Sequence, residues 1–149
     1  MKKDAKFWSS ILILTVGILI ASRGVIVGIF EGKLLSGHDT TAYPMILSQF
    51  DENIRSGNWY PIWANRMQYG YGEAFLMFRP PVYSYVSEGF YFLTGHLFTA
   101  IHLTNIFFLM MSAVGMFFLS RIIWSSTLLA SFAASAYILS PYVLVDLYV

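Results

Sequence analysis

The polar residues that could do chemistry are concentrated between Gly37 and Pro81, in a loop set between apolar runs. Asp39 stands at the entrance of this loop, and His38 precedes it. A carboxylate there could take a proton from an acceptor hydroxyl, or hold a divalent cation such as Mg²⁺ or Mn²⁺. The histidine could orient the carboxylate, although one His-Asp pair falls short of the ligand number of usual metal sites. Asp39 is therefore the first candidate catalytic residue and metal ligand, and His38 the second.

Asp39 has an alternative interpretation as a helix cap. Asp39, Thr40 and Thr41 are residue types that favour the N-cap position, and Pro44 suits a first helical turn, where its missing N–H costs nothing. A plain N-cap contributes about 1 kcal/mol to stability. Spacing alone favours the cap over the catalyst.

Two arginines and two glutamates are further candidates for substrate contacts. Arg66 and Arg79 could bind a phosphate, because the guanidinium group can donate two parallel hydrogen bonds to an anion. Snorkelling at a membrane interface explains both arginines equally well. Of the carboxylates Glu73 and Glu88, the second is the more unusual, since it lies in an apolar block where ionisable residues are costly.

Aromatic side chains crowd the second half of the loop. Glycines on both sides of Tyr71 would let the backbone approach a ligand closely, which makes Tyr71 a candidate substrate contact. Trp and Tyr also favour the headgroup level of a membrane, because one end of the side chain is apolar and the other is polar. Interface anchoring is favoured over sugar stacking for this set, which comprises Trp59, Tyr60, Trp63, Tyr69, Tyr71, Phe75 and Phe78.

The composition requires a bilayer. The 149 residues are 57% hydrophobic and only 11% charged, whereas ordinary soluble domains are about 25% charged. The net charge of +1 and the absence of a basic stripe argue against a nucleic-acid partner. Because the chain has no cysteine, disulfides, Cys-ligated zinc and thiol catalysis are excluded.

The first apolar run predicts a transmembrane helix over residues 7–30, because about 20 apolar residues span a bilayer core. The run lacks the Ala-x-Ala cleavage pattern of a secretory signal and continues after Arg23. Lys2, Lys3 and Lys6 place its N-terminus in the cytoplasm. Arg23 either snorkels toward the far interface, or forms a buried ion pair or an anionic-ligand contact.

Residues 31–79 are expected to form a large outside loop with one amphipathic helix at about 41–56. Ser56-Gly57 supply a C-terminal stop for this helix. Such a helix lies along the membrane interface or packs on the transmembrane bundle. Its apolar stripe has the spacing i, i+3, i+4, i+7 and i+11, and consists of Tyr43, Ile46, Leu47, Phe50 and Ile54.

The second half of the chain predicts a short or re-entrant helix over 80–95 and transmembrane helices over 98–120 and 125–147. Arg121 separates the last two. If 80–95 crosses the membrane fully, Arg121 lies outside, against the positive-inside tendency; if 80–95 is re-entrant, Arg121 is cytoplasmic. The expected fold is an all-α integral membrane protein with three to four transmembrane helices and an amphipathic interfacial helix in the first outside loop.

The helices expected here make a poor stand-alone bundle, because three or four spans would carry a large exposed loop. We expect a single membrane domain that is the N-terminal part of a larger polytopic protein. The rest of that protein, or partner membrane subunits, would cover the exposed helix faces.

The order of several short motifs resembles a known group of membrane proteins. An early loop Asp is followed by an amphipathic helix ending in Ser-Gly, and then by aromatic and proline motifs. The motifs are Asp39, Ser56-Gly57, Tyr60-Pro61-x-Trp63, Gly70-Tyr71-Gly72, Pro80-Pro81, Ser140-Pro141-Tyr142 and Asp146-Leu147-Tyr148. From about Gly37 onward, the chain resembles the N-terminal region of GT-C-type polytopic membrane proteins. The nearest group is the bacterial and archaeal membrane proteins named as related to 6-pyruvoyl-tetrahydropterin synthase; lipid-phosphosugar-dependent glycosyltransferases are more distant.

The resemblance implies transfer of a sugar from a polyprenyl-phosphate donor on the non-cytoplasmic face of a prokaryotic cell membrane. Asp39 corresponds to the first-loop acidic residue of the family. The chain has His38-Asp39 where well-studied glycosyltransferases have paired acidic residues, so metal dependence stays open. Pterin chemistry is not expected, because the three histidines are scattered. The alternative is a non-catalytic polytopic protein, structural or transport-associated, that retains the same architecture.

Overall fold

The computed structural model describes residues 2–34 and 42–148. Within these ranges the protein is built from helices, and its one β contact is an isolated antiparallel bridge between Ala64 and Glu73. The all-α prediction is therefore confirmed. The helices are α1 (Lys2–Glu31), α2 (Ala42–Arg55), the 3₁₀ helices η1 (Gln68–Gly70) and η2 (Ala74–Phe78), α3 (Pro81–Thr94), α4 (Leu97–Trp124), α5 (Thr127–Ile138) and α6 (Pro141–Tyr148).

Two of these helices are long and apolar enough to cross a membrane. They are Phe7–Glu31 within α1, with 25 residues, and α4, with 28 residues. A bent pair formed by α5 and α6 would be a third span if it crosses as one unit. By contrast, the 14 residues of α3 rise only about 21 Å, which is less than the hydrocarbon core of about 30 Å.

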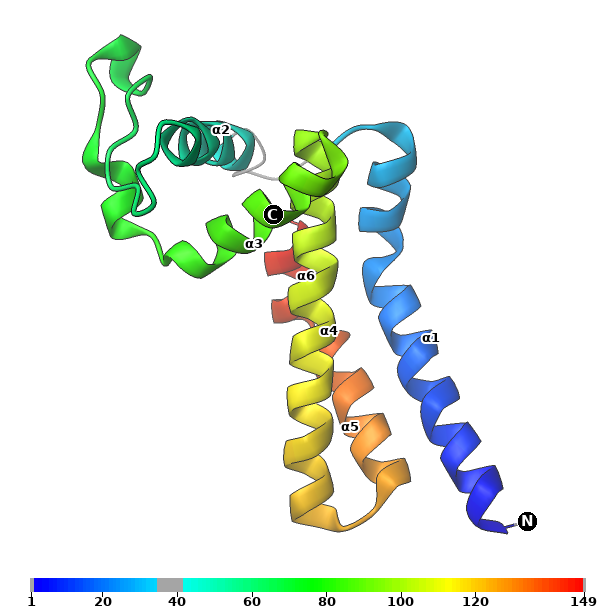
Figure 1. Cartoon of the computed structure of the whole chain (residues 1–149). Helices are drawn as coiled ribbons and strands as arrows, with labels where there is room; N and C mark the ends of the chain where they lie inside the picture. The colour runs from blue at the N-terminus through cyan, green and yellow to red at the C-terminus, as the bar shows by residue number, and fades with distance from the viewer. Residues whose placement is uncertain (1, 35–41, 149) are drawn as a thin grey trace.

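The apolar helices pack as a bundle in which α5 contacts both α1 and α4 (Figure 1). Small residues allow the close approach. A Cβ atom on Gly17 of α1 would lie 2.8 Å from Ser135 Oγ of α5, and the Ser135 hydroxyl donates to the Ile13 carbonyl at 3.2 Å. Small side chains and interhelical hydrogen bonds are the usual means of holding membrane helices together. Two further small residues, Ala21 of α1 and Ala113 of α4, belong to one buried apolar cluster of this bundle.

The exit of α1 is fixed to α4 by a histidine. His102 is almost fully buried, and its Nε2 atom lies 2.8 Å from the Lys33 carbonyl oxygen. Because a carbonyl only accepts, Nε2 carries the proton and donates. A Cβ on Gly28 would come within 2.7 Å of the same ring, so a glycine is needed where the two helices meet.

The structure differs from the sequence expectations at two helix ends. Arg121 does not end the helix expected over 98–120, since α4 continues through it to Trp124; arginine is a good helix former. The helix expected over 125–147 is broken near Ser140, and α5 and α6 meet at 53°. Pro141 opens α6, because a proline lacks the N–H that a continuous helix would need there.

The remaining helices lie at one end of the bundle (Figure 1). There α2 is viewed nearly end-on, whereas α1 and α4 are viewed from the side, so α2 runs across the direction of the long helices. An apolar cluster that includes Leu47, Ala100 and Ile101 joins α2 to the start of α4. Gly95, at φ 68°, ends α3 and allows the chain to turn into α4.

Candidate functional site

A pocket of about 320 Å³ opens where α2, α3 and the start of α4 meet. The α2 stripe supplies one wall, and Pro80 together with three residues of α3 supplies another, with the spacing i, i+3, i+4 and i+7. The lining residues are Tyr43, Ile46 and Leu47 of α2, Arg79 and Pro80 before α3, Tyr83, Ser84 and Ser87 of α3, and Ile101 of α4. Most of the lining surface is apolar, with one cation at its edge.

Arg79 is the cation of this pocket. Its guanidinium carbon lies 4.9 Å from the ring centroid of Phe75 and 5.6 Å from that of Tyr43. Such contacts hold the charge over the ring faces and leave the N–H groups at its edge available. No carboxylate in residues 2–34 or 42–148 forms an ion pair with Arg79. A half-buried arginine in this state can accept an anionic ligand such as a phosphate.

The α3 wall carries hydroxyl groups that differ in whether they form a hydrogen bond. The Tyr83 hydroxyl donates to Asn105 Oδ1 at 2.7 Å, and burial raises the pKa of Tyr83 above its usual range. This hydroxyl therefore stays protonated at neutral pH. Ser87 has 1% of its surface exposed, and its Oγ atom has no hydrogen-bond partner among the described residues.

A pair of carboxylates lies beside the pocket, between α2 and α3. Asp51 pairs with Arg55 one turn later on α2. Glu88 of α3 is buried, and its Oε2 atom lacks a hydrogen-bond partner in the described part of the chain. Burial raises the pKa of Glu88 to about 7; the nearby Asp51 carboxylate adds to the rise and Arg55 opposes it. Glu88 can therefore gain or lose a proton near neutral pH.

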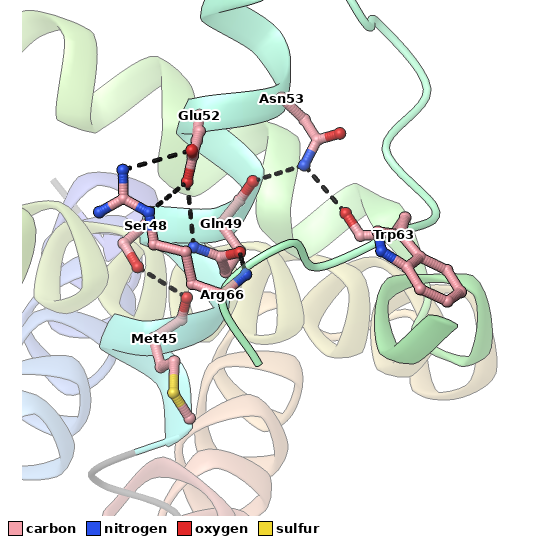
Figure 2. A network of polar contacts seen from close by, with 7 residues as sticks. All are labelled: Met45, Ser48, Gln49, Glu52, Asn53, Trp63 and Arg66. Atoms are coloured by element: carbon pink, nitrogen blue, oxygen red, sulfur yellow. Dashed lines mark hydrogen bonds and ion pairs between the residues drawn. The ribbon is translucent and has the colours of Figure 1, made fainter. Parts of the chain in front are cut away.

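Figure 2 shows that Arg66 belongs to a network that holds the loop on α2. Its Nε atom lies 3.0 Å from Glu52 Oε2, and its backbone N–H donates to Gln49 Oε1 at 2.7 Å. Asn53 Nδ2 donates to the Trp63 carbonyl at 3.0 Å and to the Gln49 carbonyl at 2.8 Å. The network gives Arg66 a structural partner, in contrast to Arg79.

Tyr71 and Glu73 lie at the end of the loop, which is closed by a backbone bridge. The Ala64 N–H donates to the Glu73 carbonyl at 2.8 Å, and the reverse bond is 3.1 Å. The Glu73 carboxylate accepts from Gln68 Nε2 at 3.1 Å, and Tyr71 is exposed. Gly72 is required in this turn, because a Cβ there would lie 2.3 Å from Trp63 Nε1.

The structure brings one sequence-predicted contact, Arg79, into the pocket and places Glu88 beside it. Arg66, Tyr71 and Glu73 do not line the pocket. Asp39 and His38 lie outside the described residues, so the cation expected at Asp39 stays a prediction. Within residues 2–34 and 42–148, no group of three or more metal-binding side chains comes together.

Two features of the site were missed by reasoning from the sequence. Ser87 was not singled out, although Pro80, Tyr83, Ser84 and Ser87 repeat at helical spacing and mark one face. Asp51 was not singled out either, because its contact with Glu88 joins α2 to α3 and leaves no local signal in the sequence.

Comparison with protein-family models, with curated proteins and with solved structures finds no match to this chain. Its fold and its pocket therefore carry the functional argument.

Proposed function

We propose that this chain forms part of a GT-C-like membrane glycosyltransferase, which transfers a sugar from a polyprenyl-phosphate donor on the non-cytoplasmic face of a prokaryotic cell membrane. The observation that carries the proposal is Arg79, a cation without a carboxylate partner among the described residues, at the edge of a mainly apolar pocket. The pocket lies next to α4, one of the two candidate membrane spans.

The chemistry of a lipid-linked sugar fits this combination. Its phosphate needs cationic donors that stabilise the anion when the sugar leaves. Its isoprenoid chain needs an apolar wall, which Ile46, Leu47 and Ile101 supply. An arginine held over aromatic rings keeps its N–H donors at a fixed position. Fixed donors favour transfer of a planar or tetrahedral anion from water to the site.

Asp39 has the role of acceptor base or cation ligand in this proposal. It precedes Tyr43, a residue of the α2 wall, by four positions in the sequence. The proposed reaction needs a carboxylate for the acceptor and a cationic site for the donor phosphate, and the two candidates are Asp39 and Arg79.

The test is photo-crosslinking of membranes that contain the full-length gene product, with a polyprenyl phosphate carrying a benzophenone group. The wild-type protein should be labelled, and Arg79→Gln should reduce labelling at least about tenfold, since charge-assisted hydrogen bonds to the phosphate are lost. Arg121→Gln is the matched control, because Arg121 lies in the last turn of α4, far from Ile101 of the pocket. Unlabelled polyprenyl phosphate should compete for the site, and phosphatidylglycerol should not.

Asp39→Asn separates binding from transfer in the same membranes. This variant keeps a good N-cap residue and should keep the label while losing sugar transfer. Labelling of Arg79→Gln at the wild-type level would overturn the donor site. Labelling of the wild type without any sugar transfer would instead assign the chain to a non-catalytic protein that retains the architecture.

A further inference from the structure

We propose that Ser87 recognises the sugar of the bound donor, by a hydrogen bond between its Oγ atom and a sugar hydroxyl. The inference rests on the proposed function and adds a specificity-determining residue to its pocket. The observation behind it is a serine that is 1% exposed, lines the pocket, and has an Oγ atom without a partner in the described structure.

The position of Ser87 relative to Arg79 sets the direction in which the donor would lie. Arg79 and Pro80 precede α3, and Ser87 is on the pocket face of α3 almost two turns further along. The rise from Pro81 to Ser87 is about 9 Å. A phosphate at Arg79 therefore leaves room along α3 for a further group of the ligand.

The unpartnered hydroxyl decides which group that is. An isoprenoid chain has no hydrogen-bonding atom, so placing it against Ser87 would leave the buried hydroxyl unsatisfied, which is unfavourable. A sugar presents several hydroxyls that can donate or accept. The neighbouring Tyr83 hydroxyl donates to Asn105 Oδ1, so its proton is not available to a ligand. Ser84 and Ser87 carry the other hydroxyls of this wall. The Ser87 Oγ atom lies close enough to Tyr83 to lower the pKa of that tyrosine, and it is the one that is buried without a hydrogen bond in the described structure.

The aromatic side chains of the pocket support the same assignment. The rings of Tyr43 and Tyr83 lie with their centroids 5.5 Å apart, and both line the pocket. A sugar has apolar C–H faces as well as hydroxyls, and aromatic rings suit ligands of this mixed kind. The apolar stripe of α2 then faces the isoprenoid chain, and Ser87 faces the sugar.

The experiment measures preference for the sugar in the benzophenone crosslinking assay with full-length protein in membranes. Two competitors are used, the methyl ester of polyprenyl phosphate and polyprenyl phosphate carrying one hexose, so that both are phosphodiesters of equal charge. Each competitor is scored by the concentration that halves labelling. In the wild type, the hexose-bearing lipid should compete more strongly, by roughly two- to tenfold, which is the range of one neutral hydrogen bond.

Ser87→Ala should abolish this preference while leaving competition by the sugar-free methyl ester unchanged. Ser87→Thr keeps a hydroxyl and should retain the preference. The matched control is Ser112→Ala, because the Ser112 hydroxyl is bonded to the Phe108 carbonyl of its own helix at 2.8 Å. Thermal unfolding in detergent checks that each variant is folded.

The outcomes separate this inference from the proposed function. One outcome is that labelling of the wild type depends on Arg79 while Ser87→Ala keeps the full sugar preference. The Ser87 hydroxyl is then structural or bound to water, so this inference is wrong and the proposed function stands. Equal weakening of both competitors by Ser87→Ala also overturns the inference, because the serine then supports the pocket without reading the sugar. If the wild type is not labelled at all, both proposals fail.

Discussion

At the scale of single residues, the two candidate arginines show how a partner changes the meaning of a charge. Arg66 and Arg79 are indistinguishable from the sequence, since each stands in the same aromatic loop. In the structure Arg66 pairs with Glu52, whereas Arg79 faces two rings and has no such partner in the described residues. The first is explained by loop packing, and the second is the one available for an anionic ligand.

Glu88 carries the pH dependence that we predict at this scale. Its pKa is raised from 4.5 to about 7 by burial, with Asp51 adding to the rise and Arg55 opposing it. The folded state therefore binds more protons than the unfolded state between about pH 4.5 and 7. Stability then falls as the pH rises through this window, by less than about 3 kcal/mol, because the full difference between 4.5 and about 7 corresponds to about 3.4 kcal/mol and solvent screens part of it.

Glu88→Gln replaces the ionisable group with a neutral one and should remove this loss. The variant should unfold at a higher temperature than the wild type at pH 8, and at nearly the same temperature at pH 4. Thermal unfolding in detergent across this range measures the difference. Glu73→Gln is the control, because the Glu73 carboxylate lies in an exposed contact of the loop. A Glu88→Gln advantage that is the same at pH 4 and pH 8 would contradict the prediction.

At the scale of helices, the sequence predicts a helix whose apolar residues recur at helical spacing, but it does not predict where a long apolar run is broken into two helices. The stripe that includes Tyr43, Ile46 and Leu47 predicts the helix that forms α2. The break at Ser140 was missed because an apolar run with one proline also fits a kinked transmembrane helix. The pocket itself could not be predicted, since its walls come from α2, α3 and α4, and their contacts are long-range.

The seam between α1 and α5 gives a prediction for helix packing. Gly17→Ala places a Cβ atom 2.8 Å from Ser135 Oγ and 2.9 Å from Ser135 Cβ, so the two helices must move apart. We expect a loss of about 1–3 kcal/mol, the usual range for overpacking, measured as a lower unfolding temperature in detergent.

Two further variants make the Gly17 prediction specific. Adding Ser135→Gly to Gly17→Ala removes both short contacts and should recover part of the loss. Gly115→Ala is the matched control, because a Cβ at Gly115 has no atom within 4 Å and alanine favours a helix over glycine. Destabilisation by Gly115→Ala as large as that by Gly17→Ala would show that the seam is not the cause.

At the scale of the whole molecule, the structure places Arg121, near the end of α4, at the end of the bundle where α1 begins. The start of α1, which begins at Lys2, and the connection from α4 to α5 lie at the same end in Figure 1, opposite α2 and the loop that follows it. Arg121 is in the last turn of α4 and so lies near that connection. Of the two topologies that the sequence leaves open, this arrangement agrees with a re-entrant or interfacial α3, and it meets the positive-inside tendency when the N-terminus is cytoplasmic.

The orientation can be tested directly, because the chain has no cysteine of its own. We predict that Ser56→Cys, at the exposed end of α2, reacts with a membrane-impermeant thiol reagent in intact cells. Ser125→Cys, in the exposed connection after α4, should react only after the cells are permeabilised. The physical reason is that the apolar α4 separates the two positions by the thickness of a bilayer. The reverse labelling pattern would show that the molecule has the opposite orientation, with the Arg79 pocket on the cytoplasmic face, where a donor site for outside transfer could not work. Labelling of both positions in intact cells would show that α4 does not span the membrane.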